Sequence, residues 1–322
     1  MIKKIIIAVV KTLIIIGAYY FVVKKIYTSP DIQNFKYYFI DLKNYHYFLL
    51  LIIFFLMFLN WSFESLKWKF LIKSLENISF FNSFKAIWVG ITVGTVTPNR
   101  IGEFGGRILF LKKQNRTKAV SLTLYGDLSQ FIVTIVLGIA GFYFITSNVL
   151  FANSEIKQFE QLIVLFSALA IILALFFYFN INFCFQKLNK IKKIKKLAQK
   201  FTPDQISFEI KIKSILLSMF RYAIFSSQFY FAMQFFGIEI SFLNSLIATS
   251  SIYLSLNIIP NIPFAEIGLR ASFAVIFLGL FTDKITAIVL ASLLIYAINI
   301  ALPTIIGGIF LIKHRNTPYQ HL

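Results

Sequence analysis

The chain has 322 residues, of which 58% are hydrophobic and only 14% are charged. Soluble domains carry about 25% charged residues, so this composition excludes an ordinary soluble protein and predicts an integral membrane protein. The formal net charge of +19 does not indicate nucleic-acid binding, because the basic residues lie in loops between apolar segments. A single cysteine, Cys184, excludes an intramolecular disulfide framework, and three scattered histidines give no metal-ligand spacing.

The apolar segments, taken in chain order, predict an all-α polytopic fold. The first, MIKKIIIAVVKTLIIIGAYYFVV, is interrupted by Lys11 and lacks a small-residue cleavage site, so we expect a retained helix and not a signal peptide. Runs of about 20 apolar residues can cross a bilayer. Full spans are predicted near 5–23, 46–72, 118–146, 159–182, 212–236 and 284–312.

Two further apolar stretches, 80–111 and 242–281, are broken in the middle by Pro, Gly and charged residues. Each is expected to form a re-entrant helical hairpin or a pair of short tilted spans, and both alternatives give the same topology. Each would return the chain to the side from which it came. The sequence therefore predicts about six full transmembrane helices plus two broken hairpins.

The distribution of Lys and Arg orients these segments. Basic residues are concentrated in 1–4, 67–118, 183–213 and 313–322, which are therefore predicted to be cytoplasmic, with both termini inside. The prediction is one integral membrane domain, 1–322, with a first repeat at about 46–182, a basic cytoplasmic linker at 183–211 and a second repeat at about 212–312.

An internal repeat relates the two broken stretches. ISFFNSF at 78–84 recurs as ISFLNSL at 240–246, and Pro-Asn follows in both copies at 98–99 and 260–261. Next comes the pattern E-x-G-x-R. By the charge distribution, the first copy enters from the cytoplasm and the second from outside, so we predict an inverted-topology repeat, which is typical of transporters.

The charged residues of the repeat are the candidate substrate-binding site. A helix is expected to restart after Pro-Asn, and Glu and Arg four residues apart then share a face and pair. Arginine binds phosphate bidentately, so two such hairpins suit an anionic headgroup. The alternative is structural: the pairs lock half-helices together, or a cytoplasmic arginine anchors to headgroups. The candidate residues are Asn99, Arg100, Glu103, Arg107, Asn261, Glu266 and Arg270.

Two ionisable residues lie inside other predicted spans. Asp127 is a candidate for proton or ion coupling, together with Glu103; pairing with an arginine and an interfacial or capping role stay open. For Arg221, in LLSMFRYAIF, we favour an interpretation in which the side chain snorkels to the interface.

The segment Lys187–Lys200, KLNKIKKIKKLAQK, places lysines on one helical side and Ile and Leu on the other. It is predicted to bind anionic lipid as an interfacial helix, or to serve only as a topology determinant. No nucleotide-binding loop, zinc-protease or nucleophile-elbow motif is present, so we expect no catalytic residues, cofactor, metal or nucleic-acid partner.

The motifs LNWSFESLKWKF, TPNRIGEFGGR and IIPNIPFAEIGLR resemble the transmembrane region of the lysylphosphatidylglycerol synthase/flippase family. The resemblance covers essentially the whole chain and implies a lipid-handling membrane domain. Some members add a cytosolic aminoacyl-transferase domain; this chain corresponds to the membrane part, for which the resemblance implies translocation. Lys67 and Lys69 stand where arginine is common in the family.

Together these observations predict a flippase-like translocase for a membrane lipid or glycolipid in a bacterial cytoplasmic membrane. The alternatives are a membrane-embedded transferase for phospholipid or polyprenyl-linked substrates, with Glu103 or Asp127 as general base, and an accessory subunit of a separately encoded lipid-modifying enzyme.

Overall fold

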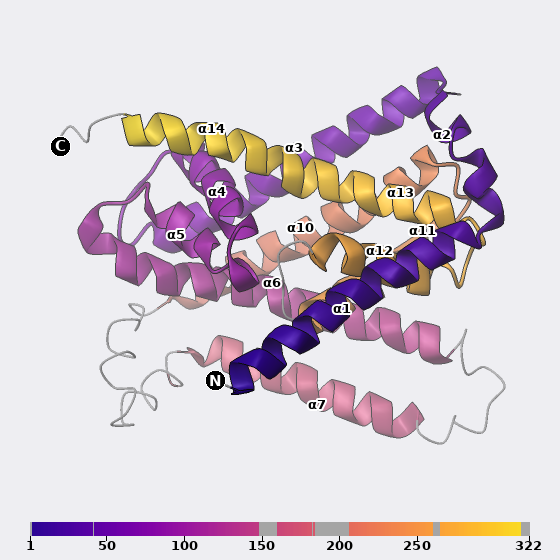
Figure 1. Cartoon of the computed structure of the whole chain (residues 1–322). Helices are drawn as coiled ribbons and strands as arrows, with labels where there is room; N and C mark the ends of the chain where they lie inside the picture. Colours follow the sequence, from indigo (N-terminus) through magenta and orange to yellow (C-terminus); the bar gives the residue numbers. More distant parts are fainter. Residues whose placement is uncertain are drawn as a thin grey trace. The chain divides into compact units, whose positions relative to one another are not determined.

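The computed structural model describes residues 2–40, 42–147, 160–181, 183, 206–259 and 265–316, and its regular elements there are all helical (Figure 1). This confirms the prediction of an all-α polytopic membrane protein. The number of spans and the side on which the termini lie stay predictions. The elements are α1 (Ile2–Tyr27), η1 (Pro30–Asn34), α2 (Tyr37–Ile40), α3 (Asn44–Ile72), α4 (Phe80–Thr95), η2 (Pro98–Arg100), α5 (Gly102–Ile108), η3 (Lys113–Asn115), α6 (Arg116–Ile145), α7 (Glu160–Phe179), α10 (Phe208–Phe235), α11 (Phe242–Ile258), α12 (Ala265–Leu278), α13 (Ile285–Tyr296), a π-helical turn (Ala297–Ala301) and α14 (Leu302–Asn316).

Three helical segments of the described chain are long and apolar enough to cross a bilayer: Asn44–Ile72, Lys113–Ile145 and Ile285–His314. They match three of the predicted full spans. Val164–Phe179 and Phe242–Ile258 are shorter apolar helices.

The chain forms two compact units whose segments alternate along the sequence. Unit 1 comprises Met1–Phe58, Leu137–Gln161 and Ile224–Asn299, and unit 2 comprises Leu59–Val136, Leu162–Ala223 and Ile300–Leu322. The helices α3, α6 and α10 each contribute to both. The proposed repeat boundaries and the basic linker stay predictions.

Each predicted broken stretch is a helical hairpin. In unit 2, α4 packs against α5, and in unit 1, α11 packs against α12 (Figure 1). Ser79 caps α4 by accepting a hydrogen bond from the amide of Asn82, and Ser241 caps α11 in the same way with Asn244, both at 3.2 Å. The two copies therefore share local structure as well as sequence. Their inverted orientation stays a prediction.

Glycines allow α4 and α5 to pack at close range. A Cβ on Gly106 would lie 2.7 Å from the Cα of Gly90, and a Cβ on Gly102 would lie 2.5 Å from the carbonyl oxygen of Val93. The third glycine of the motif, Gly105, has open space in the direction of its missing Cβ. Two of the three glycines of the motif therefore allow close backbone packing within the hairpin.

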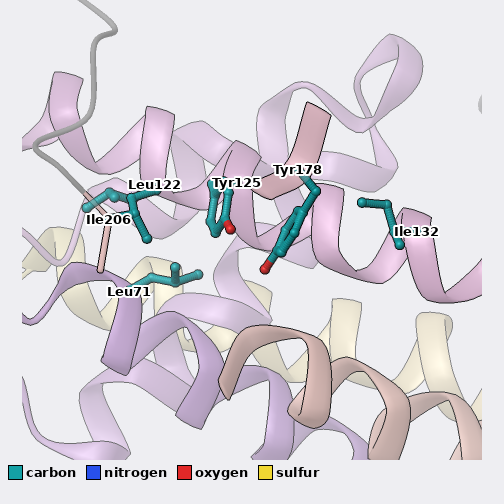
Figure 2. Close-up of a cluster of buried hydrophobic side chains, with 6 residues drawn as sticks. All are labelled: Leu71, Leu122, Tyr125, Ile132, Tyr178 and Ile206. Atoms are coloured by element: carbon teal, nitrogen blue, oxygen red, sulfur yellow. The ribbon is translucent and has the colours of Figure 1, made fainter. Parts of the chain in front are cut away.

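An aromatic pair anchors the apolar core of unit 2. The rings of Tyr125 in α6 and Tyr178 in α7 stack with centroids 4.7 Å apart (Figure 2). The hydroxyl of Tyr178 donates to the carbonyl oxygen of Lys211, 2.9 Å away, so the polar end of the buried ring is satisfied. The buried cluster consists of Leu71, Leu122, Tyr125, Ile132, Tyr178 and Ile206.

In unit 1, an acidic side chain caps α13. The carboxylate of Asp31 accepts hydrogen bonds from the amides of Thr286 and Ala287, each at 3.1 Å, and also from the hydroxyl groups of Ser29 and Tyr38. These amides belong to the first turn of the helix, where backbone donors otherwise lack partners. Asp31 therefore fixes the segment that follows α1 to the start of α13.

Candidate functional site

A buried carboxylate in α3 is the centre of an ionic network in unit 2. Oε1 of Glu64 lies 2.9 Å from Nη1 of Arg107, and its Oε2 lies 2.9 Å from Nζ of Lys67 and also contacts Nη1 of Arg221. The Glu64 side chain is only 2% exposed. A charge so deeply buried in a membrane helix requires partners, and here three cations supply them.

The hairpin helix α5 brings Arg107 into this network. Its side chain is 3% exposed, pairs with Glu103 one turn earlier, and lies 4.0 Å from Oδ1 of Asp127 in α6. Glu103 is thus shared between the hairpin and the network. The predicted Glu–Arg pair of the first repeat is present, but the arginine is also held by a carboxylate 43 residues before it.

Arg221, in α10, belongs to the same network. Its Nε donates to Oδ1 of Asn60 at 3.1 Å, its Nη1 donates to Oε1 of Gln130 at 3.2 Å, and its guanidinium carbon lies 5.5 Å from the centroid of the Trp61 ring. The snorkelling interpretation is therefore wrong: the side chain is 14% exposed and points to Glu64. Because Glu64 of α3 neutralises the guanidinium group, Arg221 does not need to extend to the membrane interface.

Lys67 has a polar environment of its own in the same region. Its ammonium group donates to the hydroxyl of Ser218 at 3.3 Å, and that hydroxyl is 2.9 Å from the hydroxyl of Ser129. With a side chain 1% exposed, the lysine is held in place by a carboxylate and a hydroxyl pair.

The ionic network described above contains six charged side chains, and their formal charges balance. Three carboxylates meet three cations, so the network carries no net charge when every group is ionised. Such balance limits the cost of burying ions in a medium of low polarity. We name this set the Glu64 cluster; it consists of Glu64, Lys67, Glu103, Arg107, Asp127 and Arg221.

The turn between α4 and α5 has an unusual backbone. Asn99 and Arg100 both have positive φ values, 53° and 54°, and α5 begins only at Gly102. The helix restarts after Pro-Asn as expected, and a left-handed turn separates Pro98 from the start of α5. Such conformations cost energy in residues other than glycine and concentrate at functional sites.

The same turn presents a guanidinium group with free donors. Nε and Nη2 of Arg100 are buried, and neither has a hydrogen-bond partner in the part of the chain that the structure describes. These two nitrogens form one edge of the guanidinium plane, which is the edge that binds a carboxylate or phosphate bidentately. Arg100 is thus a cation outside the Glu64 cluster with unused bonding capacity.

The second hairpin, in unit 1, carries the equivalent pair. Nη2 of Arg270 lies 2.9 Å from Oε1 of Glu266, while Nε and Nη1 are buried and without a partner among the described residues. As in α5, the glutamate is the second residue of its helix and the arginine follows four residues later. Gly268 between them lets the ring of Tyr19 in α1 approach to 3.3 Å from the position of a Cβ.

Three of the predicted functional elements remain to be placed. Two of them, Asn261 and the segment Lys187–Lys200, lie outside the residues that the structure describes. Asn99 is exposed, and its side chain has no hydrogen bond within the described part of the chain.

Sequence reasoning missed Glu64 and the role of Lys67 in the site. A signal was available, because Asn60, Glu64 and Lys67 recur at helical spacing inside an apolar helix. An ionisable residue within a span is by default a functional candidate.

These features define a polytopic helical membrane protein with a buried ionic network among its helices. The chain belongs to the family described as lysylphosphatidylglycerol synthase TM region, which matches residues 4–307. The resemblance inferred from the sequence motifs is thereby confirmed, and the family consists of membrane domains linked to lipid modification and flipping. A comparison with curated proteins finds no match.

Proposed function

We propose that this protein translocates an anionic membrane lipid or glycolipid between leaflets, with Arg100 of the first hairpin and Arg270 of the second hairpin as headgroup ligands. The observation that carries the proposal is that Arg100 and Arg270 keep buried guanidinium nitrogens without partners in the described structure. A buried donor left unsatisfied is costly, and an oxygen of an anionic headgroup at these guanidinium groups would supply the missing acceptor.

The paired residues support this division of roles. Arg107 uses both terminal nitrogens on Glu64 and Glu103 and keeps only Nε without a partner among the described residues, so it shapes the site and adds positive potential. Arg100 has both Nε and Nη2 without a partner among those residues. In the second hairpin, Glu266 orients Arg270, and two other nitrogens of Arg270 have no partner within the described part of the chain. A phosphate oxygen fits such donors better than a neutral headgroup does.

Sequence features support transport over synthesis. The predicted inverted repeat is typical of transporters, in which two matched halves expose a site alternately to either side. The positive-inside pattern supports insertion in a bacterial cytoplasmic membrane, where anionic phospholipids are available as substrate and as a ligand for Lys187–Lys200. A separately encoded enzyme that makes the lipid would be the natural partner.

The test is flux in proteoliposomes that contain phosphatidylglycerol with a fluorescent tail label. Translocation is followed by the loss of fluorescence when a membrane-impermeant reductant reaches the outer leaflet. We expect Arg100→Ala and Arg270→Ala to lower the rate at least tenfold, and Arg100→Lys to restore it only in part because lysine lacks the bidentate edge. The control is Lys213→Ala, which removes an exposed cation paired with Glu209 and should leave the rate unchanged.

Two outcomes would contradict the proposal. If both alanine variants move the lipid at the wild-type rate, the hairpin arginines are not headgroup ligands. If mass spectrometry of the recovered probe shows a new covalent group, the protein is a transferase and translocation is not its primary activity.

A further inference from the structure

Asp127 differs from the other carboxylates of the Glu64 cluster. Its side chain is 42% exposed, whereas the side chains of Glu103 and Glu64 are 18% and 2% exposed. Its closest ionic contact is 4.0 Å, to Arg107, and the structure gives it no hydrogen bond among the described residues. Asp127 is therefore the one loosely held acid of the cluster.

The position of Asp127 places this acid inside a membrane span. It follows Arg116, the first residue of α6, by 11 positions in Lys113–Ile145, which is about 16 Å along a helix. A charge at such a depth is expensive, and acids in this setting commonly carry protons in transport proteins.

Protonation of Asp127 would change the charge of the whole cluster. With all six groups ionised the net charge is zero; a proton on Asp127 leaves two carboxylates against three cations, a net charge of +1. The carboxylates that remain are the two that are tightly paired. The charged groups that act on Asp127 are Arg107 and Glu103 from α5 and Glu64 and Lys67 from α3. Arg221 from α10 joins the cluster through its contact with Glu64.

We propose that Asp127 is a protonation switch that makes the Glu64 cluster attract an anionic lipid headgroup when protonated and release it when ionised. This inference rests on the proposed function and names its driving ion, the proton. The headgroup takes the place of the charge that Asp127 loses, because either one balances the third cation. Arg100, with its free edge in the preceding turn of the hairpin, supplies a direct ligand.

Proton binding at Asp127 and binding of the anionic lipid are thermodynamically linked, and this linkage determines how a proton gradient would act on the protein. If a proton on Asp127 strengthens anion binding, then a bound anion strengthens proton binding by the same factor. Lipid and proton would therefore occupy the site together, and a proton gradient would bias the direction of lipid movement.

The test measures binding separately from flux. The probe is phosphatidylglycerol with a fluorescent tail, titrated into purified full-length protein in detergent at pH 5.5 and pH 8, with labelled phosphatidylcholine as the comparator without net charge. We expect the wild type to bind the anionic probe at least about tenfold more tightly at pH 5.5, because the cluster then carries one more positive charge. Asp127→Asn should bind tightly at both values, because the amide cannot ionise.

Three further variants make the result specific. Asp127→Glu keeps a titratable acid and should keep the pH dependence, which also guards against a folding defect in the amide variant. Glu209→Gln removes an exposed acid of α10 and should behave as the wild type. His314→Gln removes the histidine of α14, which contacts the carbonyl oxygen of Leu109; it too should keep the pH dependence.

The outcomes separate this inference from the proposed function. If the wild type binds the anionic probe equally at both pH values, or if Asp127→Asn keeps the wild-type pH dependence, the switch is wrong and the translocase proposal survives. If His314→Gln alone abolishes the pH dependence, the switch is assigned to the wrong residue. If no variant binds the anionic probe at either pH, both proposals fall.

Discussion

Glu64 and Arg107 are 43 residues apart in sequence, yet Oε1 of the glutamate lies 2.9 Å from Nη1 of the arginine, and both side chains are almost fully buried. The contact ties the hairpin helix α5 to the membrane-spanning helix α3. It shows that Arg107, one of the residues that the sequence suggested for substrate binding, has a structural role as an ion-pair partner.

We expect Glu64→Gln to destabilise the protein by about 3–5 kcal/mol, because removal of one partner leaves buried cations without a counter-ion. Intrinsic tryptophan fluorescence during thermal unfolding in detergent measures the change. The control is Glu209→Gln, which breaks an exposed ion pair with Lys213 and should cost at most about 1 kcal/mol. Equal unfolding temperatures for the two variants would show that Glu64 does not support the fold.

We expect Gly106→Ala to destabilise the α4–α5 hairpin by about 1–3 kcal/mol, because its Cβ would lie 2.7 Å from the Cα of Gly90 and backbone atoms cannot move aside cheaply. Gly105→Ala is the matched control, since open space faces its Cβ and alanine favours helix. The same unfolding assay compares them. A stable Gly106→Ala variant would mean that the two helices pack less closely than the structure has them.

We expect Asn99→Gly to retain or raise stability and Asn99→Ala to lower it by about 1–2 kcal/mol, because the residue has a φ of 53° and only glycine adopts that conformation without cost. If Asn99→Gly also keeps lipid flux, the asparagine acts through its backbone. If Asn99→Gly unfolds at a lower temperature than Asn99→Ala, the positive φ at position 99 does not determine which residue is preferred there.

We expect the contribution of Asp31 to stability to disappear in acid. Burial raises the pKa of this carboxyl, but hydrogen bonds from Ser29 and from the amides of Thr286 and Ala287 outweigh that effect, so its pKa lies below the ordinary value of 3.8. A lowered folded-state pKa means that the ionised group stabilises the fold above the unfolded-state value and that this contribution is lost as pH falls through the folded-state value.

The corresponding experiment compares Asp31→Asn with the wild type. The variant should be less stable by about 0.5–2 kcal/mol at pH 7, as for the loss of a helix cap, and the difference should shrink below about pH 4. Asp283→Asn, an exposed position before α13, serves as the control and should show no such pattern. A constant difference between pH 3 and pH 7 would contradict the assignment.

Hydropathy and charge patterns predicted much of the fold. Apolar runs of sufficient length must form helices in a bilayer, because backbone groups have no water to bond to. Thus 46–72 and 118–146 correspond to α3 and to the segment containing α6, and both broken stretches are helical hairpins. The local Glu–Arg pairs could also be predicted from the sequence, because residues four apart on a helix are neighbours whatever surrounds them.

The ion-pair partners that are distant in sequence could not be predicted in this way. Arg221 was assigned to the interface because its own segment contains nothing to pair with, and Glu64 was not recognised because hydropathy alone does not show where its partners lie. Both assignments depend on which faces of α3, α5 and α10 meet, and that is a property of packing.

The sequence by itself determined the class of protein, the helical segments, the repeat and the family, because these follow from periodicity, composition and local spacing. Only the tertiary structure decided which charges neutralise one another: it placed three cations around Glu64 and left Arg100 and Arg270 with donors that have no partner among the described residues. The physical reason is that Coulombic and hydrogen-bond energies act over a few ångströms in space, and positions in the sequence do not specify those distances.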